Sequence, residues 1–149
     1  MMSKLISTLE QLHLMRSRAV DDLSLKLATQ KQLCQRFEKN IDSLSSLASG
    51  MANSNLNSPV MMSNQSTYKH VIQRVIDWQK QEHALANLEA QKMQGTLVAE
   101  ARREKSLELV LEAKRRDRQQ EHNRREQKMT DSISAQCWLR QQQITTRQR

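Results

Sequence analysis

Apolar residues recur along the first third of the chain at alternating spacings of three and four. The series is Leu5, Leu9, Leu12, Ala19, Leu23, Leu27, Cys34, Phe37, Ile41, Leu44 and Ala48, with Arg16 and Gln30 at its two polar positions. This alternation is typical of a helix that packs along one seam against another helix. It predicts a helix over residues 3–48, with a stutter between Leu23 and Leu27 that would locally unwind the supercoil.

The segment 49–58, SGMANSNLNS, is the clearest break in the pattern. Asn and Ser favour turns, and Gly50 suits a left-handed helix cap. Pro59 follows Ser58, and proline is well tolerated at the first position of a helix. We therefore predict a turn over residues 49–58 and a second helix over residues 59–144, followed by a frayed tail. Residues 1–149 would form a single coiled-coil domain.

The second helix carries a weaker apolar series. Its members are Tyr68, Val71, Val75, Trp78, Leu85, Leu88, Met93, Leu97, Ala101, Leu107 and Leu111. Over residues 112–128 the stripe disappears, and the segment holds seven basic and four acidic side chains. Apolar residues return at Met129, Ile133 and Trp138.

The two lengths predict an all-α fold, an antiparallel two-helix coiled-coil hairpin with a longer, overhanging second helix. If the turn centres near residue 53 or 54, residue i lies opposite residue 107 − i, so Leu5 faces Arg102. The second helix would then overhang the first by roughly 50 Å or more. Ion pairs such as Glu121 with Arg125 would each support the overhang by only about 0.2–0.5 kcal/mol. We interpret it as a segment that another protein surrounds.

Composition agrees with long helices and excludes a thick globular core. Only 37% of the chain is apolar, with two glycines, one proline and four aromatic residues. The net charge of +8 is concentrated in residues 67–149, which hold 17 basic and 11 acidic groups. A basic surplus favours an acidic partner without choosing among nucleic acid, anionic lipid and protein.

Chemistry-bearing motifs are missing from the sequence. No phosphate-binding loop, zinc motif or nucleophile setting occurs, and the four histidines are scattered singly. Cys34 and Cys137 are far apart, which disfavours a disulfide and fits a reducing compartment. We expect no enzyme activity, cofactor, metal site, small-molecule substrate or nucleic-acid partner. With no signal peptide and no long apolar run, a cytoplasmic location is expected.

Two interpretations of the stripe Tyr68, Val71, Val75 and Trp78 remain open. An aromatic stripe at helical spacing is usually core, but near a hairpin tip only one helix is available to cover it. Partly exposed aromatic residues at such a place would be docking anchors.

From Ala101 onward the sequence resembles the C-terminal half of FliJ proteins of the bacterial flagellar export apparatus. The matching features are Arg103-Glu104-Lys105, the step from Leu107 to Leu111, the basic run 114–118, and Gln127-Lys128-Met129-Thr130-Asp131. Tyr68 also opens a Tyr-x-x-apolar-apolar segment early in the second helix, as in that family.

The resemblance implies a non-enzymatic stalk that inserts into the hexameric export ATPase, promotes its assembly and couples it to the membrane-embedded export gate. Other implied partners are the ATPase regulator and substrate chaperones, with peripheral association at the inner membrane and a monomer when free. ATPase-binding candidates are Arg102, Arg103, Arg115, Arg116, Gln127, Lys128 and Asp131. Gate-binding candidates are Phe37, Ile41, Leu44, Tyr68, Val71, Val75 and Trp78.

Other functions remain open at this point. The equivalent stalk of a virulence injectisome would share these features. A generic coiled-coil scaffold that dimerises through the first seam predicts a doubled mass, whereas the hairpin predicts a monomer near 17.4 kDa. A basic nucleic-acid binder would show salt-sensitive binding.

Overall fold

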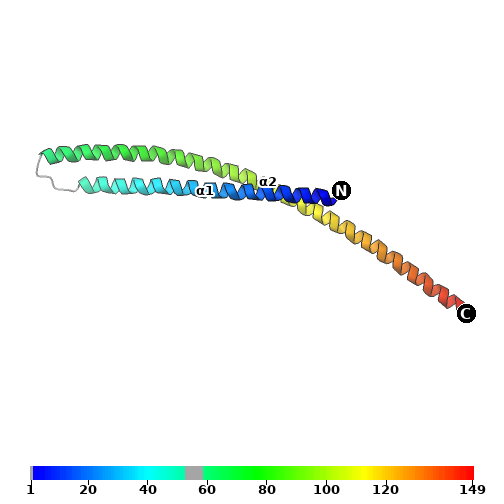
Figure 1. The fold of residues 1–149 in the computed structure, drawn as a ribbon. Helices are drawn as coiled ribbons and strands as arrows, with labels where there is room; N and C mark the ends of the chain where they lie inside the picture. Colours follow the sequence, from blue (N-terminus) through cyan, green and yellow to red (C-terminus); the bar gives the residue numbers. More distant parts are fainter. Residues whose placement is uncertain (1, 53–58) are drawn as a thin grey trace. The chain divides into compact units, whose positions relative to one another are not determined.

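The computed structural model describes residues 2–52 and 59–149, which form two long helices (Figure 1). Helix α1 spans Met2–Ala52 and helix α2 spans Pro59–Arg147, with 51 and 89 residues. Gln30 of α1 bonds to Ala86 of α2, and Gln65 near the start of α2 donates a hydrogen bond to the Met51 carbonyl near the end of α1. The helices are therefore antiparallel, and the predicted all-α hairpin with a longer second helix is confirmed.

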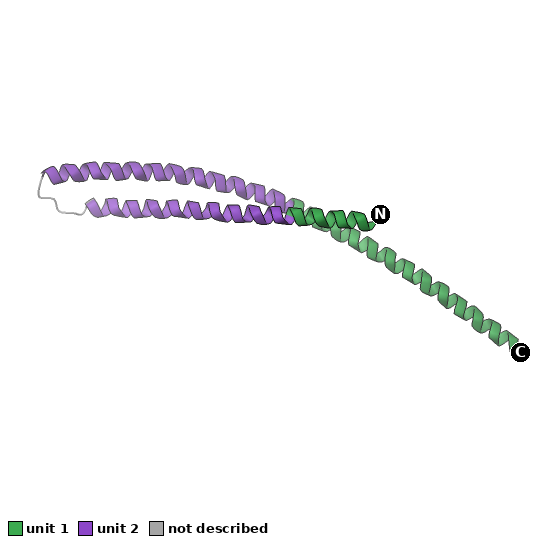
Figure 2. Cartoon of the chain, viewed as in Figure 1, with its two compact units in different colours: residues 1–16, 103–149 green, residues 17–102 purple. Residues whose placement is uncertain are grey.

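Tertiary contacts divide the chain into two compact units, and both helices pass through both units (Figure 2). Unit 1 consists of Met1–Arg16 and Arg103–Arg149, and unit 2 is the continuous segment Ser17–Arg102. Each unit pairs a stretch of α1 with a stretch of α2.

Helix α1 continues past the glycine that was predicted to end it. Gly50 lies inside α1, and neither glycine of the chain has a positive φ. The left-handed cap at this position was therefore wrong. Met51 and Ala52 are good helix formers that carry the helix one turn further, at a modest local cost for the glycine. Residues 53–58, including the predicted cap Ser58, lie outside the described part of the chain.

Over residues 68–85, the seam of unit 2 is formed by residues one position away from the predicted α2 stripe, whereas Met93 and Leu97 are partly covered as predicted. Ile72 and Ile76 are buried, at 5% and 4% exposure, whereas Val71 and Val75 are exposed. The prediction of a Tyr68–Trp78 seam was wrong because Val-Ile pairs at 71–72 and 75–76 offer two equally spaced stripes. The larger isoleucines face α1. On the α1 side, Leu27 and Cys34 are buried as predicted.

In unit 1 a one-residue shift occurs only at the start of α1, because Leu111 is buried and Leu9 is partly covered as predicted. Ile6 and Leu111 are buried at 2% and 4% exposure, while Leu5 is 46% exposed. From residue 6 to residue 27, the covered positions on α1 are residues 6, 9, 13, 16, 17, 19, 20, 23 and 27. Ala19 of the predicted series and its neighbour Val20 are both partly covered. The stutter between Leu23 and Leu27 therefore stays a prediction.

The residues that face each other across the pair also differ from those predicted for a turn centred near residue 53 or 54. That prediction places residue 77 opposite Gln30, but Gln30 bonds to Ala86. In unit 1 the same prediction places residue 94 opposite His13, but the Glu104 carboxylate lies 3.8 Å from the His13 ring nitrogen Nε2. The physical reason is that residues 59–64 are exposed and the pairing begins only at Met51 and Gln65. The seam positions therefore set the register, and the centre of the turn does not.

In unit 1, the C-terminal part of α2 extends well beyond the segment that α1 covers. Residues 122–149 are all exposed, and 122–147 correspond to about 40 Å of helix. Glu121 accepts hydrogen bonds from Arg124 at 3.1 Å and from Arg125 at 3.3 Å. Local pairs of this kind, rather than packing, support the overhang.

Candidate functional site

Unit 2 carries an exposed apolar surface, which we call the apolar face. Each of its residues immediately precedes a seam position on its own helix. Their exposed fractions range from 38% for Leu33 and Val75 to 61% for Leu85. The members are Leu33, Leu47, Tyr68, Val71, Val75, Trp78 and Leu85.

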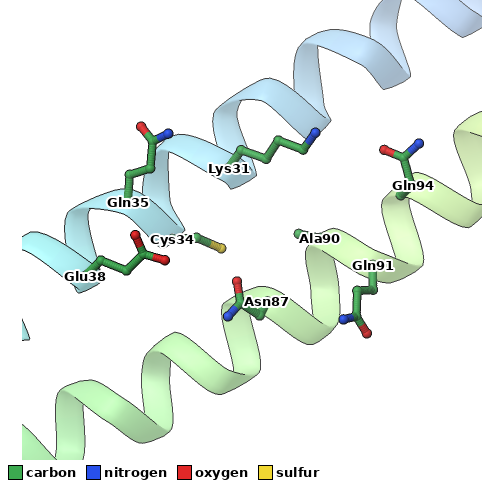
Figure 3. Close-up of a pocket in the computed structure, with 8 residues that line it drawn as sticks. All are labelled: Lys31, Cys34, Gln35, Glu38, Asn87, Ala90, Gln91 and Gln94. Carbon is green, nitrogen blue, oxygen red and sulfur yellow. The ribbon is translucent and has the colours of Figure 1, made fainter.

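Both helices contribute to the same side of the pair for a geometric reason. Around a helix axis, the residue just before or just after a seam residue lies about 100° from it. In an antiparallel pair, the residues that precede seam residues lie on the same side of the pair on both helices, and the residues that follow seam residues lie on the opposite side. The opposite side confirms this geometry. A single groove there is lined by Lys31, Cys34, Gln35 and Glu38 of α1 and by Asn87, Ala90, Gln91 and Gln94 of α2 (Figure 3).

This second side is polar, and we call it the polar face. Its groove forms where small seam residues, Cys34 and Ala90, leave space between the helices. Glu38 lies 3.2 Å from the His83 ring across the pair. The two sides of the unit 2 hairpin therefore differ. The polar face carries amide and charged side chains. On the other side, the exposed apolar residues come mainly from α2, because on α1 the polar residues Arg36, Asn40 and Ser43 lie between Leu33 and Leu47.

The gate-binding candidates do not come together as one patch. Phe37, Ile41 and Leu44 are half-buried in the seam of unit 2. Tyr68 and Trp78 are 53% and 55% exposed on the apolar face, together with Val71 and Val75. The core interpretation of this aromatic stripe was wrong, because the side chains face solvent. The first three candidates support the pair from inside, and the last four offer a surface.

Sequence reasoning missed the residues that extend this surface. Leu33 and Leu47 of α1 join the apolar face, and Arg74 lines a groove with Val71, Val75 and Trp78. Once the seam residues were known, the two leucines could have been identified as residues that immediately precede them. Arg74 gave no apolar signal.

The ATPase-binding candidates are all exposed on α2. Arg102 belongs to unit 2 and the other six to unit 1. Arg115 donates a 2.7 Å hydrogen bond to Glu10 of α1, so it is held at the end of the paired region.

The remaining candidates of unit 1 fall on more than one side of the helix. At 100° per residue, Arg116, Gln127 and Asp131 lie within about 60° of one another, whereas Lys128 lies about 100° from Gln127. The first three form the most coherent surface of the set.

A second exposed apolar stripe lies on the same uncovered segment. Met129, Ile133 and Ile144 are 68%, 57% and 57% exposed, and exposed Cys137 lies between them. Spacings of four and seven place these side chains on one side of the helix. The sequence showed these residues, and the structure leaves them uncovered in unit 1.

The described residues contain no group of three His, Cys, Asp or Glu side chains that could hold a metal ion. Within residues 2–52 and 59–149, neither helix has a stretch apolar enough to cross a bilayer.

The comparison with known proteins identifies the family to which this helical hairpin belongs. No curated protein and no solved structure matches the chain. Residues 5–143 match the family described as flagellar FliJ protein, which covers nearly the whole chain and confirms the resemblance. The chain belongs to the FliJ family and is a non-catalytic component of the flagellar export apparatus.

Proposed function

We propose that the chain is a stalk whose uncovered C-terminal segment enters the ring of the hexameric export ATPase. There it promotes ring assembly and couples the ATPase to the export gate. In this role it would also contact the ATPase regulator and substrate chaperones, and would associate peripherally with the inner membrane. When free, the chain would be a monomer.

The observation that carries this proposal is the full exposure of residues 122–149 on a helix that remains continuous to Arg147. A helix without tertiary cover is marginal in water, because most helical stability comes from packing of one face. A ring that surrounds the segment would supply that packing. Met129 and Ile133 give it an apolar surface to bury, and Lys128 gives it a charge to pair.

Gate binding would use the apolar face of unit 2. Val71, Val75 and Trp78 are exposed and line one groove, so a partner can bury them without opening the seam. Phe37, Ile41 and Leu44 would act indirectly, by holding α1 against α2. Differential contacts with ring and gate would couple the two.

The test adds the purified chain to the cognate export ATPase and measures hydrolysis and hexamer content. Both should rise. The double variant Arg116→Ala with Gln127→Ala should lose most of the effect. A matched double variant, Arg118→Ala with Gln136→Ala, changes the same residue types on another side of the helix and should keep it. If the unmodified chain changes neither hydrolysis nor hexamer content, the proposal is wrong.

A further inference from the structure

The stripe that α1 covers in unit 1 continues onto the uncovered part of α2. Leu111 is buried at 4% exposure, whereas Met129 is 68% exposed. The two residues are eighteen positions apart, which is five full turns at about 100° per residue, so they lie on the same side of the helix. Leu107 and Ile133 lie within about 40° of that direction. The uncovered stripe therefore extends a surface whose beginning is already occupied.

The occupant is the first part of α1, residues 2–16, which we call the strap (the green part of α1 in Figure 2). Ile6 is the only buried residue within it. Of the other three strap positions that are partly covered, one is Leu9 and two are polar, His13 and Arg16. Segments with few buried apolar contacts open at low free energy. The strap is therefore weakly held.

A polar pair in the seam weakens the attachment further. The Nε2 atom of His13 and a carboxylate oxygen of Glu104 are 3.8 Å apart across the helix pair, which is too long for a hydrogen bond. This Nε2 atom is buried and has no hydrogen-bond partner among the described residues, which destabilises the packed state. Glu10 and Arg115 do form a bond, but both side chains are about half exposed, and such surface pairs contribute little.

The strap also changes the thickness of unit 1 along α2. Beyond residue 121, α2 is uncovered, and a single helix is about 10–12 Å across with its side chains. Over residues 104–114, the strap adds a second helix of the same width. A ring closed around the single helix could advance along α2 past Lys114 only if the strap moved aside. The attachment of the strap therefore sets the limit of insertion.

We propose that the strap is a displaceable cover on the ring-binding stripe of α2. When the ring displaces it, Leu107 and Leu111 join Met129 and Ile133, and the stripe becomes longer by about 33 Å. The His13 nitrogen returns to water at the same time, which offsets part of the cost of opening. The inference rests on the proposed function in naming the ring as the partner, whereas the weak attachment of the strap is a property of the free chain.

The test replaces the polar pair by an apolar one, His13→Leu with Glu104→Leu, which should hold the strap in place. Hydrogen exchange of the full chain, read by mass spectrometry, should show that the strap amides exchange at least tenfold more slowly in this variant. Stimulation of the export ATPase should fall at least threefold. The matched control, His70→Leu with Glu89→Leu, changes the same residue types at exposed positions of unit 2 and should alter either quantity less than twofold. Far-UV circular dichroism checks that both variants remain helical.

A photoreactive residue at the partly covered position Leu107 follows the displacement itself. It should cross-link to the strap in the free chain and to the ATPase in the assembled complex. A probe that still cross-links to the strap in the complex would overturn the inference, because the ring would then bind the two helices as one unit.

Two further outcomes would overturn it. Unchanged strap exchange in the variant His13→Leu with Glu104→Leu would show that the polar pair is not the weak point. Slower exchange with full ATPase stimulation would show that the strap does not limit the ring. If the unmodified chain leaves ATPase activity and hexamer content unchanged while the exchange results hold, the ring assignment of the proposed function fails and the weakly held strap stands.

Discussion

Gln30 of α1 donates a hydrogen bond from its side-chain nitrogen to the main-chain oxygen of Ala86 on α2, at 3.0 Å. It is a polar residue in an otherwise largely apolar stretch of the unit 2 seam, between buried Leu27 and Cys34. A single polar seam residue that finds a partner in only one register helps to specify that register.

Replacing Gln30 with alanine should therefore destabilise the hairpin. The loss of one part-buried hydrogen bond is worth about 1 kcal/mol. Chemical denaturation followed by circular dichroism would measure the change. Gln32→Ala, at an exposed position two residues away, is the matched control and should leave the free energy of unfolding nearly unchanged. Equal effects of the two substitutions would show that the bond to Ala86 contributes nothing.

Gly95→Ala should stabilise the chain. Gly95 lies in the interior of α2, and a Cβ added there would meet no atom within 4 Å. Alanine is favoured over glycine in helix interiors by about 1 kcal/mol. A rise in the free energy of unfolding of this size is expected from the same denaturation experiment. A loss of stability would mean that something packs closely against this position.

The charge state of Glu121 should affect the uncovered helix at acidic pH. The hydrogen bond from Arg124, with further contributions from Arg124 and Arg125 charges, holds the pKa of this carboxyl below its ordinary value. A lowered folded-state pKa means that the stabilisation is present above the unfolded-state pKa and is lost as pH falls through the folded-state pKa. An NMR titration should show the lowered pKa. Arg124→Gln should move it back upward, and no movement would exclude Arg124 as the main cause.

The two cysteines should differ strongly in reactivity. Cys34 is 7% exposed in the unit 2 seam, whereas Cys137 is exposed on the uncovered part of α2. Access to the sulfur limits alkylation, so one equivalent of a maleimide should react quickly and the second only when the hairpin opens. Mass spectrometry of the digested product would assign the fast site. Rapid labelling of Cys34 in the native chain would contradict the packed seam.

The fold could be predicted from the sequence because it depends mainly on local features along the chain. Helix formers, one proline and heptad spacing are enough to predict two paired helices and an uncovered C-terminal segment. The exact seam was harder to assign, because adjacent apolar residues such as Val71 and Ile72 satisfy the same spacing on neighbouring faces. Side-chain size and the contact with α1 decided between them.

The candidate site was predictable only in part. Tyr68, Val71, Val75 and Trp78 were identified as one stripe, but its exposure followed from the choice of seam, which spacing did not settle. Leu33 and Leu47 belong to the same surface only because α1 and α2 are antiparallel in this register. A single sequence carries no signal for a surface that is formed by residues far apart on two different helices.

The central claim, that the uncovered end of α2 enters the export ATPase ring, is tested most directly by photo-cross-linking. A photoreactive residue placed at Gln127, in the exposed segment of unit 1, should cross-link to the purified hexamer at one chain per ring. The same residue at Gln94, on the polar face of unit 2, is the control and should give little product. Cross-linking from Gln94 but not from Gln127 would contradict the proposed stalk.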